Sequence, residues 1–209
     1  MIIMRTTFFD VDTQYDFMRS DGALYVPKAE SIIPNLTLLT QYAINNKIQI
    51  MGSVDRHFDS DAELAKNGGP FPDHCMDGTI GQKKIFETGV KAEFLTNSFD
   101  YSLEFLRKLG ISDQNIFFEK QGYDVFDNIN STEILLGSVP RQAVVYGVAT
   151  DYCVKAAVIG MIHRNIETYV ITDAIKGITP EGEKTALDEM VRQGAKLITT
   201  EEVLKKDWQ

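Results

Sequence analysis

A cysteine at the predicted start of a helix is well placed for chemistry in this chain. Residues 144–148 form an apolar run typical of a buried strand, and helical spacing of apolar residues begins at Val154. Thr150 or Asp151 is suited to cap that helix, which puts Cys153 in its first turn. Unpaired N–H groups and the helix dipole stabilise a thiolate there and can hold a developing oxyanion. We interpret Cys153 as a candidate nucleophile; the alternative is a small buried cysteine packed beneath the helix.

Carboxylates and a lysine occur at the ends of other predicted strands. Asp10, Asp12 and Asp16 fall within seven residues at the end of the first strand. Alternation along a strand puts Asp10 and Asp12 on the same side, so we expect one of them to face a site. Lys120 follows another strand, and near a thiolate and a carboxylate its ammonium would keep both ionised. Each of these residues alone is equally typical of a solvated strand end.

Asp55 and His57 have the spacing of metal ligands. Side chains two residues apart in an extended segment point the same way, so a carboxylate and an imidazole can meet one ion. His74 supplies a second imidazole from a long stretch without clear periodicity, and Glu63 lies between them. This donor set suits zinc, iron or manganese and leaves positions open for water or substrate. Two of the chain's three histidines fall in this region, which favours a metal site over the alternative that these are ordinary polar side chains exposed to solvent.

Alternating strands and helices are needed to bring these residues together. Apolar and β-branched runs predict six strands, and apolar residues at helical spacing predict the helices between them. The expected strands are 2–11, 47–54, 115–119, 142–148, 166–172 and 196–199, and the main expected helices are 31–45, 97–110, 154–162 and 179–194. Apolar strands separated by helices indicate an α/β, three-layer fold with a parallel sheet flanked by helices. Ligands bind beyond the carboxyl ends of such strands, where the candidate residues fall.

Composition limits the class of partner. The 209 residues suffice for one large domain, and without a linker or repeat we expect a single domain over 1–209. The net charge of −9 disfavours nucleic acid and anionic membranes, and no apolar run is long enough to span a bilayer. Two cysteines make no disulfide framework, and the first residues lead directly into a strand pattern without an export signal. We therefore expect reduced thiols in a cytoplasm.

The order of these motifs resembles the isochorismatase-like cysteine hydrolases, in particular their nicotinamidase-like branch. The resemblance covers essentially the whole chain and implies a six-stranded parallel sheet. It is carried by Asp12-Thr13-Gln14-Tyr15-Asp16-Phe17, Asp55-Arg56-His57, Phe71-Pro72-Asp73-His74-Cys75, Lys120 and Gly147-Val148-Ala149-Thr150-Asp151-Tyr152-Cys153-Val154.

The resemblance implies a catalytic triad of Asp12, Lys120 and Cys153. Asp12 would take the thiol proton, Lys120 would lie between Asp12 and the sulfur, and Cys153 would attack an amide carbonyl. The backbone N–H groups of Ala149 and Cys153 would form an oxyanion hole, with a cis peptide bond between Val148 and Ala149. These roles meet the needs of cysteine attack on an amide: a thiolate, a stabilised oxyanion and a proton for the departing ammonia.

The resemblance also implies a cofactor and a substrate. One divalent transition metal ion, zinc with iron or manganese as alternatives, would be held by Asp55, His57 and His74, with Glu63 as a direct or water-mediated fourth ligand. Phe17 and Phe71 would flank a flat ring. The implied reaction is hydrolysis of nicotinamide to nicotinic acid and ammonia through a cysteine thioester.

Two features depart from the nicotinamidase pattern. The family generally has an aromatic-Ser-Gly-aromatic stretch soon after the lysine, whereas this chain has Gln121–Asn128, and Arg56 stands where an aromatic residue is common. The alternatives are therefore a related hydrolase of another small amide, ureide or carbamate, a metal-free isochorismatase-type hydrolase, and a non-catalytic small-molecule-binding protein. A homo-oligomer is compatible with each. We interpret Cys75 and His163 as structural.

Overall fold

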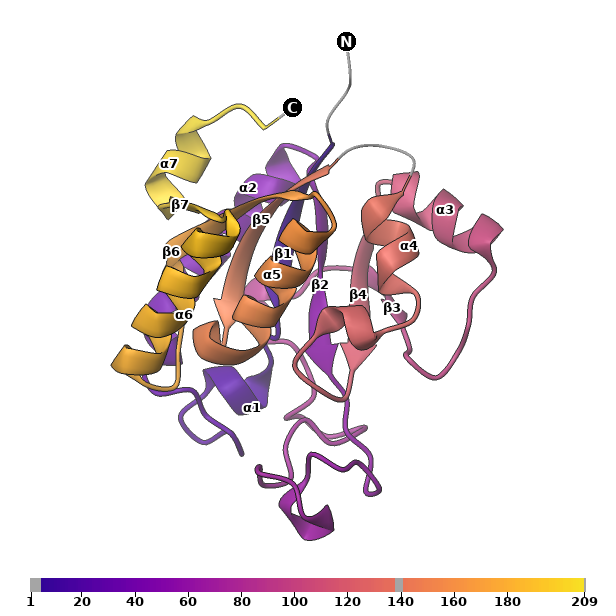
Figure 1. Cartoon of the computed structure of the whole chain (residues 1–209), viewed down its shortest axis with the longest axis vertical. Coiled ribbons are helices and arrows are strands. Elements are labelled where there is room, and N and C mark those ends of the chain that lie inside the picture. Colours follow the sequence, from indigo (N-terminus) through magenta and orange to yellow (C-terminus); the bar gives the residue numbers. More distant parts are fainter. Residues whose placement is uncertain (1–4, 138–140, 209) are drawn as a thin grey trace.

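Seven parallel strands form one sheet in the part of the chain that the structure describes (Figure 1). The structure is a computed structural model that describes residues 5–137 and 141–208. The strand order is β3-β4-β2-β1-β5-β6-β7, and every pairing is parallel. The strands are β1 (Arg5–Val11), β2 (Gln49–Asp55), β3 (Ala92–Leu95), β4 (Asn115–Lys120), β5 (Arg141–Val148), β6 (Glu167–Lys176) and β7 (Lys196–Ile198).

The parallel α/β sheet confirms the predicted fold class, but it has seven strands where six were expected. The missed strand is β3, which lies at one edge of the sheet. It is only four residues long, and its two central side chains are exposed, so it shows neither an apolar run nor alternation. Its Phe94 stacks on Phe117 of β4, with ring centroids 5.5 Å apart. Residues 2–4 of the first expected strand lie outside the described residues.

Helices cover both faces of the sheet (Figure 1). One face carries α3 (Leu103–Ile111), α4 (Ser131–Leu136), α5 (Lys155–His163) and α6 (Pro180–Gln193), packed on a cluster that includes Phe9, Val11 and Phe118. The other face carries α2 (Ile33–Asn45) and α7 (Thr200–Lys205), packed on a cluster that includes Phe8 and Phe117. The short α1 (Tyr15–Met18) follows β1. This three-layer arrangement is the one predicted from the alternation of strand-like and helix-like segments.

Helix boundaries follow local capping signals where these exist. α6 starts as expected, because the Thr179 hydroxyl accepts from the Gly182 N–H and Pro180 occupies the first turn. It ends at Gly194, whose φ of 115° suits glycine. α3 instead begins at Leu103 rather than near residue 97, because Ser102 caps it and accepts from the Phe105 N–H. Among the described residues, no helix combines the length and apolar character needed to cross a membrane.

The four central strands deliver the candidate residues to one edge of the sheet. β1 lies between β2 and β5, and β2 also pairs with β4, so their carboxyl ends are neighbours. The register sets Asp55 opposite Lys120 and Val11 opposite Gly147. Gly147 has φ 120°, and a Cβ there would come within 2.0 Å of the Val11 carbonyl oxygen. Only glycine therefore lets β5 approach β1 this closely before the chain turns toward Cys153.

Candidate active site

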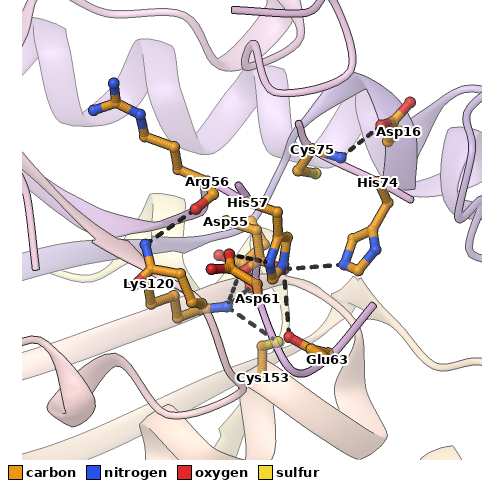
Figure 2. A network of polar contacts seen from close by, with 12 residues as sticks. Asp16, Asp55, Arg56, His57, Asp61, Glu63, His74, Cys75, Lys120 and Cys153 are labelled. Carbon is orange, nitrogen blue, oxygen red and sulfur yellow. Dashed lines mark hydrogen bonds and ion pairs between the residues drawn. The ribbon is translucent and has the colours of Figure 1, made fainter. Parts of the chain in front are cut away.

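Lys120 lies between the two other members of the predicted triad. Figure 2 shows its ammonium beside Asp55 and Cys153. Its Nζ is 2.8 Å from Asp12 Oδ2 and 3.4 Å from Cys153 Sγ, and it also contacts Asp55 Oδ1. All four side chains are buried. The structure thus brings together three residues that are more than thirty positions apart in the sequence.

Asp12 reaches this position because the chain leaves the strand just before it. β1 ends at Val11, and Asp12 adopts a left-handed φ of 48°. Its N–H donates to the Ser53 carbonyl at 3.1 Å, and its Oδ1 accepts from the Ser53 hydroxyl at 2.7 Å. The prediction that Asp10 and Asp12 share one side of the strand is wrong, because alternation stops at Val11. Asp10 pairs instead with Lys84, whose ammonium lies over the ring of Phe117 on the other face of the sheet.

Cys153 lies in a π-helical turn, Thr150–Val154, between β5 and α5. The Ala149 carbonyl accepts from the N–H groups of Tyr152 and Val154, each at 3.1 Å. Neither Thr150 nor Asp151 caps the helix, contrary to expectation, since the capping position is Ala149. The Asp151 carboxylate accepts instead from the Ile178 N–H at 3.0 Å. The Val148–Ala149 peptide bond is cis, as the family resemblance implied.

Burial and neighbouring charges together shift the pKa values of Asp12, Lys120 and Cys153. Burial raises the pKa of the Cys153 thiol well above its usual value; the Lys120 ammonium opposes this rise, and the Asp12 and Asp55 carboxylates add to it. Burial also raises the pKa of Asp12, against the attraction of Lys120. Burial disfavours the charge of Lys120, but the two carboxylates raise its pKa well above normal. Burial and the two carboxylates thus oppose the thiolate that the helix terminus favours, whereas the Lys120 ammonium supports it.

Asp55, His57 and His74 converge beside this group. Each offers one ligand atom, and these atoms all lie within 4.8 Å of one another. Both imidazole Nε2 atoms are 3.8 Å from Asp55 Oδ2. Glu63 Oε2 lies 3.6 Å from His57 Nε2. The residues predicted as metal ligands thus meet at one place, with Glu63 at its side (Figure 2).

The hydrogen bonds of the two histidines leave their Nε2 atoms directed at a common centre. His57 Nδ1 lies 3.1 Å from Asp61 Oδ2, and His74 Nδ1 lies 2.8 Å from the Pro72 carbonyl oxygen. Such contacts fix the ring orientation in metal-binding histidines. Within the described residues, the buried His57 Nε2 and Glu63 Oε2 have no hydrogen-bond partner. Because buried polar atoms are normally satisfied, this donor set fits a bound metal ion.

A narrow pocket connects the sulfur to the histidines. It has a volume of about 50 Å³. Phe17 and Phe71, which were predicted to flank a flat ring, are among the residues that line it, and their ring centroids lie 5.7 Å and 5.9 Å from that of His74. The other lining residues are Asp12, Leu24, Val26, Asp55, Glu63, His74, Tyr123, Val148, Ala149, Tyr152, Cys153 and Ile178. The space suits a small, flat and largely apolar molecule.

Several pocket residues were not identified from the sequence. Tyr123 and Tyr152 lie beside Phe71, at centroid distances of 6.1 Å and 6.0 Å, and 5.3 Å from each other. Leu24 and Val26 come from an irregular segment in which no periodicity marks them. Tyr123 belongs to the stretch that departs from the nicotinamidase pattern, and that departure was the one available signal.

Arg56, the other departure, does not line the pocket. Its side chain points away from the histidines (Figure 2) and pairs with Glu119 at 2.9 Å and Asp77 at 2.8 Å. Asp16 is also outside the pocket, where its carboxylate accepts from the N–H groups of Ala23 and Cys75 and so ties two loop segments together.

Comparison with known proteins places the chain in a family. A family model described as the isochorismatase domain matches residues 6–202. The chain belongs to the isochorismatase family. This confirms the family predicted from the motifs, and with it the prediction of a hydrolase.

Individual relatives point to one branch of the isochorismatase family. The nicotinamidase of Escherichia coli (strain K12) is 26% identical over 212 residues, covering 90% of this chain and 92% of the relative. The nicotinamidase of Saccharomyces cerevisiae is 24% identical, covering 85% of this chain and 90% of the relative. The crystal structure of the pyrazinamidase of Pyrococcus horikoshii in complex with zinc has a TM-score of 0.75 at 29% identity, covering 93% of this chain and 99% of that chain.

Proposed function

We propose that this protein is a metal-containing cysteine amidohydrolase that converts nicotinamide and water to nicotinic acid and ammonia. The observation that carries the proposal is the position of Lys120 Nζ, 2.8 Å from Asp12 and 3.4 Å from Cys153, next to a ready-made set of metal ligands. The nicotinamidase names of the relatives support the choice of substrate.

Asp12 is the proton carrier in this mechanism. It accepts the thiol proton as Cys153 Sγ forms a bond to the amide carbonyl carbon, and it gives that proton to the nitrogen as the carbon–nitrogen bond breaks and ammonia leaves. The product of this half is a thioester. Asp12 then takes a proton from an attacking water, the carbon–sulfur bond breaks, and the proton returns to sulfur. The raised pKa of Asp12 supports this role, because it makes the carboxylate a stronger base than an ordinary aspartate.

Lys120 and two backbone groups stabilise the charges that develop. Since Lys120 stays protonated between Asp12 and Cys153, it favours the thiolate at the moment the proton leaves. The N–H groups of Ala149 and Cys153 bind the oxyanion of the tetrahedral intermediate, and the turn that follows β5 supports this role by setting both residues at the pocket wall.

Asp55, His57 and His74 would hold the divalent transition metal ion, with Glu63 as direct or water-mediated fourth ligand. Zinc is our first choice, since two imidazoles and a carboxylate suit it, and iron or manganese are the alternatives. When bound, the ion would act as a Lewis acid toward the ring nitrogen or an ordered water. Phe17 and Phe71 flank the ring, and Phe71 is itself held by Tyr123 and Tyr152.

Ammonia release from nicotinamide tests this function directly. Purified protein loaded with zinc should release ammonia and leave nicotinic acid, both measured over time. Benzamide, which carries the amide but lacks the ring nitrogen, should be a much poorer substrate. Equal rates on the two amides would contradict the metal's role in binding the ring. No turnover of nicotinamide by metal-loaded protein would reject the substrate.

A second candidate substrate class is another small amide, ureide or carbamate. Tyr123 favours it, because this residue enters the pocket from the segment that departs from the nicotinamidase pattern. A screen of ammonia release over small amides separates the two. If another amide reacts and nicotinamide does not, the cysteine chemistry stands and the nicotinamidase assignment falls.

Domain extent, location and assembly remain predictions. We propose that residues 1–209 form one hydrolase domain, of which 1–4, 138–140 and 209 lie outside the described residues. We also propose a cytoplasmic protein that binds neither nucleic acid nor membrane, in keeping with its net charge of −9. Light scattering of the purified protein tests for a homo-oligomer.

A further inference from the structure

A buried ion pair between Asp10 and Lys84 takes no part in the proposed reaction. Lys84 Nζ is 2.8 Å from Asp10 Oδ2 and lies 4.4 Å from the centroid of the Phe117 ring. Asp10 is fully buried within β1, and the Lys84 side chain is only 7% exposed. Removing two charges from water is unfavourable, and a pair of apolar side chains would often serve stability as well or better. Stability alone therefore gives no reason for the pair.

Both members of the pair bind the hydroxyl of Thr13. Lys84 Nζ donates to Thr13 Oγ1 at 2.7 Å, and Thr13 Oγ1 donates to Asp10 Oδ1 at 2.8 Å. Thr88 Oγ1 also lies 2.7 Å from Thr13 Oγ1. The hydroxyl is fully buried and has a partner on every side, so its position and orientation are defined.

Thr13 is the residue directly after Asp12, at the point where the chain leaves β1. Asp12 has a left-handed φ of 48°, a conformation that non-glycine residues adopt infrequently and that the surrounding contacts must maintain. The loop formed by residues 81–88 supplies further contacts. The Lys83 carbonyl accepts from the Tyr15 N–H at 2.9 Å, and the Ile85 N–H donates to the Thr13 carbonyl at 3.0 Å. The 81–88 loop thus runs beside the turn that carries Asp12, and Lys84 connects the loop to Asp10 and Thr13.

We propose that Asp10, Lys84 and Thr13 are positioning residues that hold Asp12 in line with Lys120 and Cys153. The proposal rests on the proposed role of Asp12 as proton carrier. A fixed hydroxyl next to Asp12 limits rotation of the turn, and small displacements of a reacting group reduce rates strongly. A polar pair does this better than an apolar one, because hydrogen bonds specify direction as well as distance.

The test separates positioning from stability with two kinds of variant. Asp10→Val combined with Lys84→Met removes the pair without leaving an unpaired charge, and Thr13→Val removes only the hydroxyl. We expect kcat on nicotinamide to fall about tenfold to a hundredfold in each, with KM and metal content unchanged. Thr13→Ser, which keeps a hydroxyl, should restore most of the rate. Glu87→Gln is the matched control. Glu87 lies on the same 81–88 loop, but its half-buried carboxylate pairs with Arg19 at 2.7 Å rather than with Thr13 or Asp12. Removing its charge should leave kcat unchanged.

A second measurement is independent of the substrate. Alkylation of Cys153 by iodoacetamide forms a carbon–sulfur bond, expels iodide and sends the thiol proton to Asp12, so it should slow in Thr13→Val and recover in Thr13→Ser. If wild-type protein is alkylated at Cys153 but turns over no nicotinamide, the substrate assignment fails while the positioning proposal is still tested. If Thr13→Val kept the wild-type kcat and the wild-type alkylation rate, the proposal would be overturned. A parallel loss of kcat, KM and metal would overturn it as well, because that pattern indicates general disturbance of the pocket.

Discussion

Replacing Lys120 with methionine tests the geometry of the candidate site most sharply. The substitution keeps an unbranched side chain of similar length and removes the charge 3.4 Å from Cys153 Sγ. Opposite unit charges at that distance attract by about 5 kcal/mol at an effective dielectric constant near 20. If water entering the vacated space recovers half of this, about 2.5 kcal/mol of thiolate stabilisation is lost, or about 10²-fold in rate. We therefore expect kcat/KM to fall by at least that factor.

Stability should respond to the same change. Lys120→Met leaves the buried Asp12 carboxylate without its counter-ion, and breaking a buried pair in this way costs about 3–5 kcal/mol. Adding Asp12→Asn should recover part of the free energy of unfolding without recovering activity, since the two residues act as a unit. The assays are ammonia release, metal analysis and denaturant unfolding of both variants. Lys184→Met is the control, because that lysine is 78% exposed on α6, where it pairs with Asp188 and not with a pocket residue.

One result would refute the reasoning. A folded, metal-loaded Lys120→Met protein that keeps more than a tenth of the wild-type kcat/KM would mean that the ammonium does not stabilise the reacting sulfur. Lys120 would then serve the fold alone.

Three further predictions concern the thiols and the metal. Cys153→Ala should abolish turnover and leave unfolding unchanged within about 1 kcal/mol, because no other group can form the thioester; residual activity above one part in a thousand would count against the mechanism. Iodoacetamide should label Cys153, which lines the pocket, well before Cys75, which has no exposed surface, as measured by peptide mass spectrometry; equal rates would mean that access to the pocket does not control reactivity. His57→Ala should remove the copurified divalent metal in elemental analysis, whereas His163→Ala should not, and metal retained by the His57 variant would reject the site.

Local patterns in the sequence determined most of the layered fold. Six strands were identified from runs of apolar and β-branched residues, since a strand buried on both faces needs such a run. The start and end of α6 followed from Thr179, Pro180 and Gly194, whose backbone preferences act within one turn of the helix. The short edge strand β3 has no such run, and only pairing with β4 makes it a strand.

The sequence also predicted many of the residues that the structure brings together in the candidate site. The spacing of Asp55 and His57 placed them together, because both lie within one extended segment. The grouping of Asp12, Lys120 and Cys153 needed the resemblance to a family, since no local rule relates residues so far apart. The structure then supplied the distances among them.

Only the tertiary structure decided the electrostatics and the shape of the pocket. A cysteine near a helix start is expected to be a thiolate, but burial raises the pKa of Cys153 instead, because the sulfur has little contact with water. Asp10 is an ordinary strand-end carboxylate in the sequence, and its pairing with Lys84 exists only because the 81–88 loop folds against β1. Tyr123 meets Phe71 for a similar reason. Backbone preference depends on near neighbours and can be predicted from them, whereas contacts, burial and charge depend on how distant segments pack.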